Sequence, residues 1–88
     1  IEFKGEGSPD GMCMDENGML WIAEWGGGQI SKWNPKNGKK IDQIKLPCPN
    51  VSSCCLDQFG NLFITTAKSY RPRDIYGGGL FYAHPIKI

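Results

Sequence analysis

Few residues of this 88-residue sequence have a type and a position that suit catalysis or metal binding. The first candidates are the acidic residues in its expected turns. Asp10 stands between Pro9 and Gly11, whereas Asp15 and Asp57 each open an Asp-x-x-Gly turn. A carboxylate can bind a hard divalent cation or take a proton from water. In a turn, an Asp side chain can also simply bond its own backbone. Each of the three therefore has a functional and a purely structural interpretation.

The four cysteines are a second candidate group. Cys13, Cys48, Cys54 and Cys55 lack the Cys-x-x-Cys spacing of a zinc site, and neighbours on a strand point to opposite faces. We therefore expect buried, reduced thiols in a cytoplasmic protein, with no redox role.

The charge balance and the apolar pattern indicate which classes of partner are not expected. Ten Lys and Arg stand against nine Asp and Glu, for a formal net charge of +1, so no basic stripe is available for phosphate backbones. No apolar run approaches the length of a membrane span, and residues 1–4 lack the order of a signal peptide. We expect neither a nucleic acid nor a membrane as partner, and a cytoplasmic location.

An internal repeat indicates the elements that position these residues. Residues 9–22 match residues 51–64 at a spacing of about 42 residues, and the glycines at 26–28 return at 77–79 after an insertion that follows Thr66. Each copy predicts short antiparallel strands: residues 12–15, 20–23, 29–33 and 41–46 in the first, and 54–57, 62–65 and 80–83 in the second. The apolar runs at 20–23 and 62–65 predict strands buried on both faces, whereas 41–46 alternates as an outer strand does.

This period predicts an all-β fold of propeller blades. A repeat of about 42 residues with four strands is typical of a blade, and two blades cannot close a ring that needs four to eight. We therefore interpret the sequence as a fragment. Its beginning is expected to be a cut and its end a natural terminus, because propellers commonly complete the last blade with an N-terminal strand.

The repeat also separates the acidic residues. Asp15 and Asp57 occupy the same place in both copies, so we interpret them as structural. Where the first copy has Asp10, the second has Ser52 in an otherwise matching segment. The blade itself does not demand a carboxylate there, which favours a functional role for Asp10.

Several motifs follow one another along the chain: Pro-Asp-Gly at 9–11, Leu-Trp-Ile-Ala at 20–23, Trp-Gly-Gly-Gly at 25–28, Ser-Ser-Cys-Cys at 52–55 and Gly-Gly-Leu-Phe at 78–81. In this order and approximate spacing they resemble the regucalcin, gluconolactonase and senescence-marker family, over almost the whole chain. The Ala-x-Trp-Gly-Gly-Gly form is similar to that of bacterial sugar-lactone lactonases.

The resemblance implies a six-bladed propeller of which this chain is the C-terminal part. It implies blade 5 at about 9–47 and blade 6 at about 51–88, the latter lacking its closing strand. It also implies one divalent cation, whether calcium, zinc, magnesium or manganese, at the top of the central channel. The implied reaction is hydrolysis of the ester bond of a sugar lactone, a small-molecule substrate.

The family resemblance carries one catalytic position over to this sequence. It implies that Asp10 is a metal ligand and the candidate general base, and that the other ligands, a Glu and an Asn, lie on blades outside these residues. A carboxylate at the start of an innermost strand offsets part of the charge of a hard cation. The fragment alone is expected to be inactive.

Other residues are secondary candidates. We expect Trp25 on the loop after the second strand, at the end of the blade that holds Asp10, where it lines the apolar face of a sugar or fills space between blades. The loop at 67–76, with Lys68, Arg71 and Arg73, is a candidate lip over the entrance. His84 has no visible partner in the sequence and is expected at the surface or at a strand end.

An alternative function belongs to another class. Asp-x-x-Gly-x-Leu-aromatic-Ile also resembles the NHL-type repeat of non-catalytic, protein-binding propellers. In either case two blades alone leave faces and a sheet edge open, so we expect the isolated chain to self-associate or to fold poorly.

Overall fold

Seven β-strands and no helix make up the part of the chain that the computed structural model describes, residues 1–3, 5 and 7–84. No helix in these residues is therefore long and apolar enough to cross a membrane. The strands are β1 (Ser8–Met14), β2 (Leu20–Trp25), β3 (Gln29–Asn34), β4 (Lys39–Lys45), β5 (Asn50–Leu56), β6 (Leu62–Ala67) and β7 (Leu80–Ala83).

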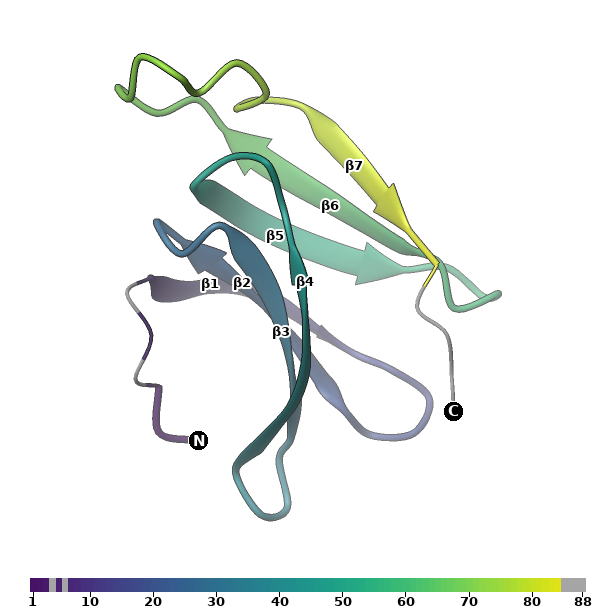
Figure 1. Cartoon of the computed structure of the whole chain (residues 1–88). Coiled ribbons are helices and arrows are strands. Elements are labelled where there is room, and N and C mark those ends of the chain that lie inside the picture. Colours follow the sequence, from purple (N-terminus) through teal and green to yellow (C-terminus); the bar gives the residue numbers. More distant parts are fainter. Residues whose placement is uncertain (4, 6, 85–88) are drawn as a thin grey trace.

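The strands form two antiparallel units that follow the sequence repeat (Figure 1). The first unit is the meander β1-β2-β3-β4, and the second is β5-β6-β7. Trp25 at the end of β2 pairs with Asn50 at the start of β5, which joins the units in one sheet. The four-strand prediction agrees with the first unit. Residues 85–88 lie outside the described residues, and the numbering of the units as blades 5 and 6 stays a prediction.

The turn between β1 and β2 is stabilised by Asp15. Its Oδ1 accepts hydrogen bonds from the backbone N–H groups of Asn17 (2.9 Å) and Met19 (3.0 Å), and its Oδ2 accepts one from the indole of Trp21 (3.1 Å). Gly18 has a φ of +81°, a conformation that favours glycine. Burial by itself raises the pKa of Asp15, but these hydrogen bonds bring it below its ordinary value.

The turn between β5 and β6 repeats this arrangement around Asp57. The backbone N–H groups of Phe59 (2.8 Å) and Asn61 (2.9 Å) donate to Oδ1, and the Asn61 amide donates to Oδ2 (3.0 Å). The hydrogen bonds from Asn61 hold the pKa of Asp57 below its usual range. His84 is exposed and follows the end of β7, as expected, and its Nδ1 contacts Oδ1 of Asn61. The structural interpretation of Asp15 and Asp57 is thus confirmed.

The core lies between the two units. It consists of apolar side chains from both units: Trp21, Ala23, Ile30, Val51, Cys54, Leu62 and Ile64. Tight packing of such side chains, rather than any helix, holds the units together.

The expectation of a strand buried on both faces is correct for β2 and wrong for β6. In β6, Leu62 and Ile64 are buried, but Phe63 is half-buried and Thr65 is exposed. The reason is that no described element covers the outer face of the second unit. There the ring of Phe63 packs edge-on against Tyr82, with ring centroids 5.4 Å apart.

The cysteines are all free thiols, but they are not all buried. Cys48 and Cys54 are buried and Cys13 is half-buried, whereas Cys55 is exposed. The expectation of a buried Cys55 is wrong because side chains alternate along β5, so that only Cys54 points into the core. The Sγ atoms of Cys13 and Cys54 lie 3.6 Å apart across the two units. This hydrogen bond lowers the pKa of Cys13 and raises that of Cys54.

Candidate functional site

A β-bulge in β1 positions Asp10. Pro9 pairs with Glu24 and Met12 pairs with Ile22, so Asp10 and Gly11 together stand opposite a single residue of β2. Bulges bend a strand and re-aim a side chain, and they are frequent beside active sites.

The second unit has a bulge at the corresponding place. Val51 pairs with Thr66 and Ser53 pairs with Thr65, which leaves Ser52 as the extra residue. Ser52 is the residue that the repeat aligns with Asp10. The bulge is therefore a property of both units, whereas the carboxylate is a property of the first alone.

The two bulged strands lie against each other. β1 contacts β5, and the Cα of Gly11 faces Ser53 with no space for a side chain between them. This close approach explains why a glycine follows Asp10. It also places Asp10 and Ser52, the neighbours of Gly11 and Ser53, at the same end of adjacent strands.

The surroundings of Asp10 differ from those of the turn aspartates Asp15 and Asp57. Its side chain is exposed, and within the described residues no group donates a hydrogen bond to its carboxylate. Ser52, by contrast, shares a 2.8 Å hydrogen bond with the hydroxyl of Thr65. Asp10 lies in the bulge of β1 and not in a turn, so its oxygens do not hold a turn as those of Asp15 and Asp57 do, and they are available to a ligand.

A hard divalent cation fits Asp10 as one oxygen ligand. In the part of the chain that the structure describes, no three His, Cys, Asp or Glu side chains gather closely enough to hold a metal ion. The described residues therefore contain no three-ligand site of such side chains around Asp10. The roles of Asp10 as metal ligand and base stay predictions.

Trp25 lies at the same end of the molecule as Asp10, but on a strand rather than on the expected loop. It is the last residue of β2 and pairs with Ser8 on one side and Asn50 on the other. Its side chain is 41% exposed, so it does not fill a core within this chain. A role in binding substrate stays a prediction.

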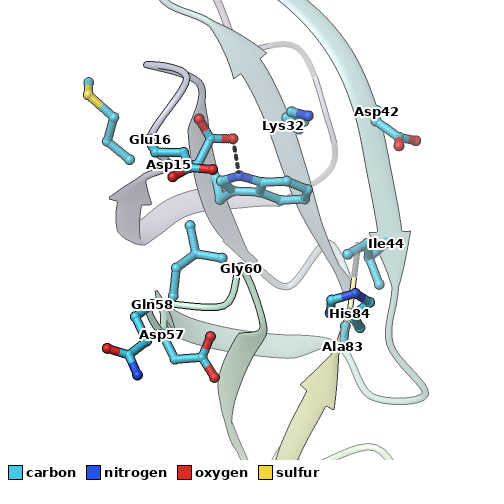
Figure 2. A pocket seen from close by; sticks show the side chains of 13 residues that line it. Asp15, Glu16, Lys32, Asp42, Ile44, Asp57, Gln58, Gly60, Ala83 and His84 are labelled. Carbon is cyan, nitrogen blue, oxygen red and sulfur yellow. Dashed lines mark hydrogen bonds between the residues drawn. The ribbon is translucent and has the colours of Figure 1, made fainter. Parts of the chain in front are cut away.

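A cavity lies at the opposite end, between the two hairpin turns (Figure 2). It has a volume of about 680 Å³ and is bordered by Asp15 and Asp57. These carboxylates already accept the hydrogen bonds of their own turns. The ammonium group of Lys32 lies 5.1 Å from the ring centre of Trp21. Neither of these two turn carboxylates is therefore as available to a ligand as that of Asp10.

Sequence reasoning missed Asp74, which organises the long loop between β6 and β7. Only 4% of Asp74 is exposed, and its carboxylate accepts hydrogen bonds from the backbone N–H groups of Ser69 (2.7 Å) and Gly77 (2.9 Å). The repeat carries a signal for it, because the buried Glu24 likewise precedes the glycines of the first copy.

The chain is similar in sequence to a known protein family. The sequence pattern of the SMP-30/Gluconolactonase/LRE-like region matches residues 1–68. The chain belongs to this family. Regucalcin of Danio rerio is 42% identical over 66 residues, which cover 73% of this chain and 22% of the relative. Regucalcin of Xenopus laevis is 35% identical over 83 residues, which cover 86% of this chain and 28% of the relative.

Solved structures of family members share the fold. A calcium-binding protein, regucalcin, of Agrobacterium tumefaciens superposes with a TM-score of 0.75 at 23% identity, over 88% of this chain and 28% of that one. A luciferin-regenerating enzyme superposes with a TM-score of 0.74 at 27% identity, over 86% and 27%. These neighbours are propellers of the regucalcin type, so the two units have a propeller-type arrangement. The chain spans 22 to 28% of the length of these relatives.

Proposed function

We propose that this chain is the C-terminal part of a divalent-cation-dependent hydrolase that opens sugar lactones, in a six-bladed propeller to which it contributes the last two blades. Its membership of the SMP-30/gluconolactonase/LRE-like family supports this proposal. The name of the Agrobacterium neighbour, a calcium-binding protein, supports a divalent cation. The single observation that carries the assignment to this chain is the exposed carboxylate of Asp10, which lacks a hydrogen-bond partner in the described residues.

The chemistry divides between the cation and the protein. A bound divalent cation polarises a carbonyl group and lowers the pKa of water. Asp10 supplies one negatively charged oxygen ligand and, as the candidate general base, accepts a proton from water at a carboxylate oxygen. Trp25 offers an exposed aromatic face at the same end, suited to the apolar face of a sugar ring.

The structure supports a fixed backbone position at Asp10. The bulge aims the side chain, while the contact of Gly11 with Ser53 anchors the backbone immediately after it. Pre-organisation of this kind matters because a ligand or base that is displaced by about 1 Å can lose two orders of magnitude in rate.

The test is lactone hydrolysis by the parent protein that contains these residues, with and without added divalent cations. Asp10→Ala is expected to reduce cation-dependent hydrolysis by at least about a hundredfold. The matched control is Ser52→Ala, which changes the equivalent bulge residue of the second unit and is expected to leave hydrolysis within about twofold of the wild type.

Two results would contradict the proposal. If Asp10→Ala hydrolyses lactones as fast as the wild type, Asp10 is neither ligand nor base. If the parent protein binds no cation and opens no lactone, the function is better explained by a non-catalytic, protein-binding propeller.

A further inference from the structure

The loops after β2, β4 and β6 lie at one end of the molecule (Figure 1). Residues of these three loops line a second cavity. Its volume is about 420 Å³. Three segments line it: the glycine turn Gly26–Gly28, the connection Lys45–Pro49, and Arg71, Arg73 and Asp74 of the long loop. Asp10 does not line this cavity, which makes it a site separate from the one proposed above.

Three of the four charged side chains that line this cavity are cationic. Lys45, Arg71 and Arg73 are exposed, and in the described part of the chain no carboxylate forms an ion pair with any of them. The acidic residue in the lining is Asp74, but its carboxylate is buried and holds the backbone of the loop. Its pKa is lowered, chiefly by hydrogen bonds from Ser69, so it remains ionised for this structural task at neutral pH.

The long loop is a hydrogen-bonded structure that holds the two arginines in place. The backbone N–H of Asp74 donates to the carbonyl of Arg71 (3.0 Å), and that of Ile75 donates to the carbonyl of Arg73 (3.0 Å). The ammonium group of Lys68 donates to the carbonyl of Asp74. The backbone that carries both arginines is thus held in a hydrogen-bonded turn, so less backbone conformational entropy is lost when they bind a ligand.

The far end of the loop is anchored to β6. The hydroxyl of Thr66 donates to the carbonyl of Gly79 (2.6 Å) and accepts from the backbone N–H of Gly78 (3.1 Å). The loop is therefore fixed at Asp74 and again where it enters β7.

Backbone hydrogen bonds join the two other segments that line the cavity, the glycine turn and the connection 45–49. The N–H of Gly28 donates to the carbonyl of Pro49 (2.9 Å), and the N–H of Leu46 donates to the carbonyl of Gly28 (2.9 Å). Gly28 has a φ of +66° and packs against the carbonyl of Cys48. Because the glycines have no side chains, a small ligand can approach this part of the lining closely.

We propose that this cavity binds the oxyanion of a small molecule, a phosphate or a carboxylate, through the guanidinium groups of Arg71 and Arg73. Planar guanidinium groups donate two parallel hydrogen bonds to such oxyanions, and Lys45 adds a third positive charge. Free phosphate, a sugar phosphate and a sugar acid all present this chemistry. The inference rests on the charges and the built loop, and it does not depend on lactone hydrolysis.

The test is isothermal titration calorimetry of the parent protein that contains these residues, at low ionic strength, with inorganic phosphate, glucose 6-phosphate and gluconate as three separate probes. We expect saturable binding of at least one probe, weakened at least about tenfold in Arg71→Gln/Arg73→Gln. The matched control is Lys36→Gln/Lys39→Gln, which removes two positive charges at the turn between β3 and β4 and is expected to change the affinity less than about twofold.

The outcomes separate the sources of the oxyanion and test the proposal itself. Tighter binding of glucose 6-phosphate than of phosphate identifies a sugar phosphate, preference for gluconate identifies a sugar acid, and equal binding of both phosphates identifies the phosphate group alone. Absence of saturable binding by all three, or equal weakening in the two double variants, overturns the proposal. Asp10→Ala is expected to bind the probe like the wild type, so failure of the lactonase proposal is distinguishable from failure of this one.

Discussion

Gly11 of β1 faces Ser53 of β5 so closely that a Cβ atom on Gly11 would lie 2.6 Å from the Cβ of Ser53 and 2.8 Å from its Cα. Real Cβ atoms essentially never show such contacts, so any side chain at position 11 must separate the two inner strands. The contact joins the units directly beside Asp10 and Ser52.

Gly11→Ala is therefore expected to lower the free energy of unfolding by about 1–3 kcal/mol, the usual cost of overpacking. Urea denaturation measures the change. Ser53→Gly in the Gly11→Ala background removes the clash with the Ser53 side chain but not with its backbone, so partial recovery is expected. If Gly11→Ala has wild-type stability, β1 and β5 do not approach each other as closely as Gly11 and Ser53 indicate.

The hairpin carboxylate of Asp15 predicts a dependence of stability on pH. Its pKa is lowered in the folded state, so its contribution is fully present above the ordinary pKa of Asp, about 4, and is lost as the pH falls through the lowered folded value. Asp15→Asn cannot titrate, so the loss of stability between neutral pH and about pH 3 is expected to be smaller than in the wild type.

Urea midpoints at a series of pH values test this prediction. Asp42→Asn, which removes an exposed carboxylate of β4, controls for the change in net charge. Identical pH profiles for Asp15→Asn and the wild type would show that the hydrogen bonds of the turn do not stabilise the charged carboxylate.

The cysteines are expected to react with iodoacetamide at very different rates. Cys55 is exposed, whereas Cys54 is buried, and its hydrogen bond with Cys13 raises its pKa. Because the thiolate is the nucleophile, Cys55 should react at least about tenfold faster than Cys54 in the folded chain. Mass spectrometry of peptides after brief labelling measures both rates, and labelling in urea, where the rates converge, is the control. Equal rates without urea would contradict the burial of Cys54.

The open face of the second unit predicts self-association of the isolated chain. Leu80 and Tyr82 are 69% and 61% exposed, and Tyr82 packs beside Phe63 on that face. Large exposed apolar faces commonly mark contact surfaces. We expect size-exclusion chromatography with light scattering to show species larger than the monomer at about 100 μM, and the monomer fraction to increase in Leu80→Glu/Tyr82→Glu. A monomeric wild type with a cooperative melting transition would count against this prediction.

The sequence alone determined the features that depend on local patterns. The repeat, the Asp-x-x-Gly turns and the short apolar runs predict the all-β fold, the strand order within the first unit and the structural roles of Asp15 and Asp57. These predictions succeed because a turn aspartate finds its hydrogen-bond partners within six residues along the chain. Family membership follows from the same motifs.

Tertiary structure decided what depends on contacts between distant segments. It shows Trp25 in a strand because Asn50 pairs with it, and Cys55 exposed because no described element covers that face of β5. It also shows that Gly11 is required by the approach of Ser53, and that Asp74 is buried while Arg71 and Arg73 stay exposed. A sequence pattern reports local preference, whereas pairing, burial and clashes arise only when segments far apart in the chain are brought together.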